Sequence, residues 1–238
     1  MLLNPESRRR PLCRQVSRRC VVSTPSHVGV ERPRGHRRIY YHVDNIQRYI
    51  RDALGIPNVM NWSIEADHHT VGSAFYSPSG KFLGFGDSGP NRPDRGEDGD
   101  VMAHEYGHAI HDDMVPGWGV FNSTTSRHEA RAMGEGFGDA LACILHQEGG
   151  GLFQPEVFED WILAPAGLRR VDGVKQYPGE GTTGTTGDWV NQVHSDGEIW
   201  SATLWSAYLA AGGTARALRL APRRAKSSCT RSSSTTFA

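Results

Sequence analysis

Two histidines and a glutamate in HEYGH, residues 104–108, are the strongest candidates for chemistry in this chain. Residues four positions apart on a helix project from one face, so the imidazoles of His104 and His108 can reach a single zinc ion. Glu105 is displaced around the helix, where it cannot easily ligate but can reach a water molecule on the metal. A surface helix with two solvated histidines would show the same letters, so this motif alone is only suggestive.

A second segment, GEGFGDA at residues 134–140, offers the missing ligand. Catalytic zinc takes three protein ligands and keeps one position open for water, and Glu135 is the candidate for the third. Asp139 follows four residues later on the same helix face, where its carboxylate can accept the free ring N–H of a ligating histidine. An exposed Glu/Asp pair is the alternative interpretation. Together with HEYGH, the segment favours a metal site formed by His104, His108 and Glu135.

The surrounding periodicity predicts the elements that must carry these residues. Apolar residues at helical spacing predict a helix over residues 39–54, which a Gly-Ile-Pro sequence ends. The segment AFYSPSGKFLGFG changes to a strand-like pattern and predicts a hairpin that turns at residues 77–80. Further helices are predicted from Asp100 onward, over residues 128–147 and over residues 198–211.

Charge divides the chain into three parts. Residues 1–38 carry ten arginines against two glutamates, and the residues after Gly212 carry six lysines and arginines and no acid. The middle is acidic and holds every element described above. We therefore expect a core over residues 39–213, flanked by a basic arm (1–38) and a basic Ser/Arg-rich tail (214–238) that are disordered or aberrant.

Composition disfavours several function classes. The basic ends lack the interleaved aromatic residues of a nucleic-acid-binding module, so we expect no nucleic-acid partner. No run approaches the ~18 apolar residues of a membrane span, and no secretory signal is visible at the amino terminus. The four cysteines show neither a CxxC pair nor a framework spacing, which argues against a cysteine zinc site or a disulfide scaffold. We expect a monomer with no membrane association.

Four segments together resemble a known family. HEYGHAIHD followed by GEGFGDALA is similar to the gluzincin metallopeptidases, and to the fungalysin group more than to thermolysin. VHSDGEIWSATLW (193–205) resembles the VHxxGExW segment of that group. SAFYSPSGKFLGFGDSG is similar to the edge strand before the zinc helix, and YYHVDNIQRYIRDALG to a helix further upstream. The matches follow the family order over residues 39–211.

The resemblance implies an α+β fold. Its centre would be a thermolysin-like zincin core with a small antiparallel sheet and an active-site HExxH helix, and the carboxy-terminal helical lobe looks incomplete. It also implies zinc as the cofactor and a water molecule as the nucleophile. Glu105 would be the general base. His194 would donate a hydrogen bond to the oxyanion, with Asp188 as its orienting partner, although an ordinary loop histidine is the alternative for His194.

The implied activity is that of a zinc-dependent endopeptidase acting on protein or peptide substrates. A truncated zinc-binding remnant without peptidase activity is the alternative. Ala74 and Tyr76 match the edge strand that binds substrate by strand addition, whereas Ser73 replaces the usual amide side chain, and a plain hairpin would explain this segment as well. Relatives are exported, so the resemblance implies an extracellular location.

Calcium is a second candidate cofactor. Asp100 lies four residues before His104, where thermolysin has a calcium ligand, and further carboxylates stand close by at Asp94, Glu97 and Asp98. Helix-start carboxylates and solvated loop charge are the favoured interpretation of this acidic segment.

Overall fold

The computed structural model describes residues 33–89, 92–117, 128–150, 153–177 and 188–213. In this part the chain is α+β, with four α-helices and two small sheets. The predicted basic tail and most of the predicted arm lie outside the described residues. The predicted start of the core at residue 39 falls inside α1, which begins at Pro33.

The first helix packs along one side of the molecule. α1 (Pro33–Arg48) continues into one turn of π-helix, η1 (Tyr49–Ala53), so the predicted helix over residues 39–54 is present and begins earlier than expected. Ile39, Ile46 and Ile50 are buried on its inner face, as their helical spacing requires. Gly55 follows with φ +61°, a conformation that favours glycine and ends the helix.

The larger sheet has three strands in the order β1-β3-β2, formed by β1 (Glu65–Thr70), β2 (Phe75–Ser77) and β3 (Phe82–Gly86). β2 and β3 form the predicted antiparallel hairpin. β1 pairs with the far side of β3 and runs parallel to it, so the sheet is mixed and the antiparallel prediction is wrong for this pair. Strand pattern does not reveal which edge of a hairpin the preceding strand joins, which is why the sequence missed this pairing.

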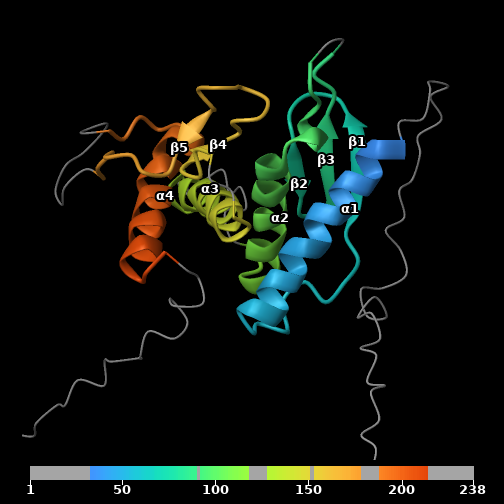
Figure 1. Ribbon diagram of the computed structural model, residues 1–238, viewed down its shortest axis with the longest axis horizontal. Coiled ribbons are helices and arrows are strands. Elements are labelled where there is room, and N and C mark those ends of the chain that lie inside the picture. Colours follow the sequence, from blue (N-terminus) through green and yellow to red (C-terminus); the bar gives the residue numbers. More distant parts are fainter. Residues whose placement is uncertain (1–32, 90–91, 118–127, 151–152, 178–187, 214–238) are drawn as a thin grey trace, which may run out of the picture.

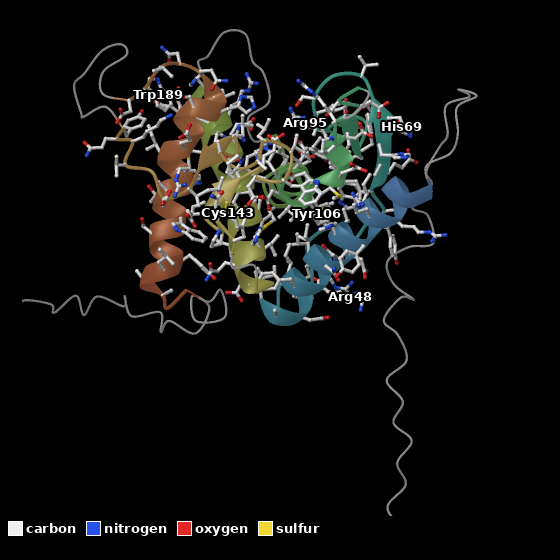
Figure 2. The ribbon with its side chains drawn as sticks, turned by 45° about the horizontal axis from the view of Figure 1, so that its top comes forward. Arg48, His69, Arg95, Tyr106, Cys143 and Trp189 are labelled. Carbon is white, nitrogen blue, oxygen red and sulfur yellow. The ribbon has the colours of Figure 1, made fainter. Side chains whose placement is uncertain are left out.

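α2 (Gly99–Met114) is the central helix of the fold, and Figure 1 shows it between the sheet with α1 on one side and α3 with α4 on the other. A short 3-10 turn, η2 (Arg95–Glu97), precedes it, and the side chain of Asp98 caps its first turn by accepting from the backbone N–H of Asp100. Tyr106, labelled in Figure 2, donates from α2 to Gln47 of α1 at 2.9 Å. The remaining faces of α2 are therefore available to the sheet and to α3.

The second half of the molecule is built on two helices in close contact, α3 (His128–Glu148) and α4 (Val193–Ala210). A Cβ atom added to Gly136 of α3 would lie 2.3 Å from the carbonyl oxygen of Gly197 on α4, so only glycine permits this crossing. A two-stranded antiparallel sheet, β4 (Val157–Phe158) with β5 (Arg169–Arg170), lies beside α3 and α4.

Candidate metal centre

Helices α2 and α3 bring three potential ligands to one point. His104 and His108 lie on α2 and Glu135 on α3, and one ligand atom from each lies within 4.8 Å of the other two. The Nε2 atoms of the two histidines are 3.0 Å apart. Glu135 Oε2 is 3.2 Å from the Nε2 of His104 and 3.6 Å from that of His108.

These separations suit a tetrahedral ion. Zinc bonds of about 2.0–2.1 Å at tetrahedral angles place neighbouring ligand atoms about 3.3 Å apart. The three distances between Nε2 of His104, Nε2 of His108 and Oε2 of Glu135 span 3.0–3.6 Å, on either side of that value. Two imidazole nitrogens and one carboxylate oxygen are also a donor set that zinc accepts. The residues present therefore fit a zinc ion.

Asp139 supports the histidine nearest to α3. Its Oδ1 lies 2.8 Å from Nδ1 of His104, the ring nitrogen that does not face the other ligands. Asp139 is fully buried, and the contact orients the imidazole so that Nε2 is left for a metal. Gly138 leaves room for that ring, because a Cβ at this position would lie 2.7 Å from Nδ1 of His104.

Arg169 is a site residue that the sequence analysis missed. From β5 it donates to both carboxylate oxygens of Asp139, from Nε at 2.6 Å and from Nη2 at 2.7 Å. Its guanidinium also lies over the ring of Phe158, 4.7 Å from the centroid, and that ring packs against His104. A basic residue on a two-residue strand has no periodicity that could signal this role.

The carboxylates around His104 make the centre favourable for a positive charge. Burial on its own would lower the pKa of His104, but Asp139, Glu135 and Glu105 outweigh it and raise that pKa to about 10. Burial would raise the pKa of Glu135, whereas the two imidazoles hold it well below its usual range. The metal-free protein therefore keeps a proton among these groups, at a place where a metal ion can replace it.

Glu105 is buried on α2, in a position where its charge raises the pKa of His104. This places the predicted base near the ligand cluster, inside the protein and away from bulk water.

His194 reaches the cluster from the first turn of α4. Its Nε2 lies 3.4 Å from Oε2 of Glu135, while the ring remains half exposed. Asp188, the predicted orienting partner, instead accepts a hydrogen bond from the backbone N–H of Gln176 at 2.8 Å. The neighbour of His194 Nδ1 is Gln192, whose amide nitrogen is 3.0 Å away. The Asp188 prediction is therefore wrong, because the chain turns that carboxylate toward another loop.

The segment expected to bind substrate lies at a free edge of the described sheet. β2 is the outer strand, next to β3 only, and Ala74 directly precedes it. The hydroxyl of Tyr76 donates to Asp112 of α2 at 2.9 Å, which ties the strand to the zinc-binding helix. The side chain of Tyr76 is therefore engaged within the protein. Only the main chain of β2 is left to pair with a substrate at this edge.

Two of the carboxylates in the acidic segment at the start of α2, Asp98 and Asp100, accept hydrogen bonds from backbone groups. Asp98 accepts from the N–H groups of Asp100 and Ile162, and Asp100 accepts from that of Glu159. Burial, together with the charge of Asp100, raises the pKa of Asp98 to about 6. Within the described residues, the ligand triad is the only group of three or more side chains placed to hold a metal. The calcium prediction therefore gains no support.

The chain was compared with known proteins. The family model of the fungalysin metallopeptidases matches residues 58–217, which include all three ligands, Asp139, Arg169 and His194. No curated protein and no solved structure shows significant similarity to the chain. Fungalysins are zinc-dependent peptidases, in agreement with the donor set and its spacing. This chain therefore belongs to the fungalysin metallopeptidase family.

Proposed function

We propose that this chain is a zinc-dependent endopeptidase in which Glu105 acts as general base and His194 as oxyanion donor. The observation that carries the proposal is the convergence of His104, His108 and Glu135 from two helices, with Nε2 of His194 3.4 Å from Glu135. Membership of the family supplies the reaction class, hydrolysis of peptide bonds.

The three ligands would hold the zinc ion. When bound, zinc supplies Lewis acidity, which polarises the scissile carbonyl and lowers the pKa of water toward neutrality. Glu105 would accept a proton from the attacking water and pass it to the leaving amine. His194 would donate a hydrogen bond to the carbonyl oxygen as negative charge develops on it.

Arg169 and Asp139 would keep the ligand geometry constant during this reaction. The bidentate contact between them leaves the carboxylate little freedom, and the carboxylate in turn fixes the ring of His104. The histidine can then neither rotate away nor present its other nitrogen to the metal.

The edge strand β2 suits an extended peptide. A substrate that adds to this edge would pair with main-chain groups next to Ala74 and Tyr76, with its scissile bond directed toward α2. Protein or peptide substrates are therefore the expected partners. Fungalysins are secreted, and among the described helices none is long and apolar enough to cross a membrane. We propose an extracellular location on the strength of the family.

The decisive experiment changes the base and leaves the ligands intact. We expect Glu105→Gln to lower the hydrolysis of a quenched peptide by about 10²–10⁴-fold, because the amide cannot accept the proton. Zinc content, measured by atomic emission, should stay at the wild-type value.

Glu65→Gln, at an exposed position of strand β1, is the matched control and should retain full activity. A wild-type protein that binds zinc but cleaves no peptide would support the alternative of metal binding without hydrolysis. Equal activity of the Glu105→Gln and Glu65→Gln proteins would overturn the role of Glu105.

A further inference from the structure

The turn before α4 places one side chain between the backbone and His194. Gln192 is the N-cap residue of α4, and its Oε1 accepts from the backbone N–H of Ser195 at 2.5 Å. Its Nε2 lies 3.0 Å from Nδ1 of His194. The same amide group thus caps the helix and contacts the imidazole that reaches the metal centre.

The backbone determines which way round this amide lies. A backbone N–H can only donate, so the atom of Gln192 that faces Ser195 N must be the oxygen. The NH₂ group is then the atom next to His194. The reverse orientation would set two donors against each other at the N-cap and leave the oxygen beside the ring.

An NH₂ group can only donate, so Nδ1 of His194 must accept the hydrogen bond and carry no proton. A neutral imidazole holds its one proton on the other nitrogen, Nε2. That nitrogen is the one that lies 3.4 Å from Oε2 of Glu135, at the open side of the ligand triad. The contact with Gln192 therefore assigns the proton of the neutral ring to the nitrogen nearest the ligand triad.

Gln192 is itself held by a buried carboxylate. Its backbone N–H donates to Oδ2 of Asp196 at 3.0 Å, and the same oxygen lies 2.8 Å from Nε2 of His128 at the start of α3. Asp196 also accepts from the backbone N–H of Val190 at 2.8 Å. The ring of Trp189, labelled in Figure 2, packs edge-on against His128. The N-cap residue is therefore anchored to both helices of this half of the molecule.

We infer that Gln192 is a positioning residue that holds His194 as the neutral tautomer with its proton on Nε2, the nitrogen that faces the metal centre. The inference rests on the proposed function for its catalytic meaning. A carboxylate partner would instead accept a hydrogen bond from an Nδ1–H group, and would favour a charged ring or the neutral tautomer with its proton on Nδ1. In this chain the oxyanion donor is a neutral imidazole, and Gln192 selects it.

Gln192→Glu tests this assignment with almost no change in shape. One carboxylate oxygen can still accept from Ser195 N and cap α4, but the other can only accept from the ring. At pH 9, above the range in which an imidazole ordinarily titrates, the single proton should therefore move to Nδ1. The lone pair of Nε2 would then face Glu135 and could not donate to the substrate.

The first readout is the protonation of each ring nitrogen of His194, from ¹H–¹⁵N correlation spectra of zinc-loaded protein with ¹⁵N-labelled histidine. His194→Ala identifies the signals. Gln176→Glu is the matched control, because it adds the same charge on an exposed residue of a nearby loop. We expect an unprotonated Nδ1 in the wild type and in Gln176→Glu, and a protonated Nδ1 in Gln192→Glu. A protonated Nδ1 in the wild type, or one pattern in all three proteins, would overturn the inference.

The second readout is kinetic. At pH 9 we expect kcat of Gln192→Glu to fall about 10²-fold, the cost of one oxyanion donor, with KM changed by less than about threefold. Equal kcat values for the Gln192→Glu and Gln176→Glu proteins would contradict the role. Absence of hydrolysis by the wild type counts against the endopeptidase proposal, whereas the nitrogen spectra still decide what Gln192 does.

Discussion

Asp139 accepts hydrogen bonds from two nitrogens of Arg169 and contacts Nδ1 of His104, all within 2.8 Å. Burial alone would raise the pKa of Asp139, but the hydrogen bonds from Arg169 and His104 lower it. Arg169 thus keeps the carboxylate of Asp139 ionised, and this carboxylate orients the ligand His104. The arginine acts on the metal through two intermediate side chains.

We expect Arg169→Leu to weaken zinc affinity by about 10–100-fold, because Asp139 would lose the cation that keeps it ionised and oriented. Competition with a chromophoric chelator measures the affinity. Arg170→Leu is the control, since the neighbouring arginine pairs with Glu156 and Asp172 on the exposed side of β5. Identical affinities for the two variants would show that Arg169 has no part in the metal centre.

His194 should matter for turnover and not for metal binding. Its Nε2 lies near Glu135 but outside the triad, so His194→Ala should leave zinc content unchanged. We expect a fall in kcat on the order of 10²–10³, the usual cost of losing one oxyanion donor. His69→Ala is the control, because it removes an exposed histidine of β1 that pairs with Asp87. Loss of zinc from His194→Ala would make His194 a ligand and remove Glu135 from that role.

At the scale of the elements, two of the three glycines of GEGFGD are explained by the two helices that α3 contacts. Gly138 faces α2, where the His104 ring occupies the space of a Cβ, and Gly136 faces α4, where the backbone of Gly197 does so. Glu135 directly precedes Gly136 on α3. The glycines therefore set the distances from one ligand to the α2 histidines and to His194.

We expect Gly197→Ala to lower the free energy of unfolding by about 1–3 kcal/mol, because its Cβ would lie 2.8 Å from the carbonyl oxygen of Ala132 and must separate α3 from α4. Urea denaturation of the zinc-loaded protein measures the change. Gly173→Ala is the control, since a Cβ there meets only the carbonyl oxygen of Arg170 at 3.7 Å. Equal stability of the two variants would mean that the helices tolerate a wider crossing.

At the scale of the whole molecule, the sequence predicted what depends on local spacing. The HEYGH spacing and the GEGFGDA segment predict His104, His108 and Glu135 as ligands, and the structure brings these three side chains together. The hairpin is predicted from its turn residues and is present. The parallel pairing of β1 and the contact of Arg169 with Asp139 join segments distant in sequence, for which no local rule exists. The neighbour of His194 is Gln192 and not the predicted Asp188. This depends on how the turn before α4 directs the two side chains, which residue spacing does not encode.

The proton held by the metal-free centre gives a test of the whole site. The pKa of His104 is raised to about 10 in the folded protein, while that of Glu135 is lowered, so near pH 7.5 the imidazole is charged and the carboxylate is already ionised. Zinc requires the neutral imidazole, so binding must displace the proton of His104. We expect release of about one proton per zinc, and an affinity that rises about tenfold per pH unit below pH 10.

Calorimetric titration of zinc in two buffers of different protonation enthalpy measures the number of protons released. In Asp139→Asn the largest raising influence on the pKa of His104 is gone, so the imidazole is closer to neutral and fewer protons should leave, although zinc binds more weakly. A binding enthalpy independent of the buffer would show that His104 is neutral before the metal arrives. The carboxylates around it would then orient the ligand without charging it, and the affinity for zinc would not rise with pH between 7 and 9.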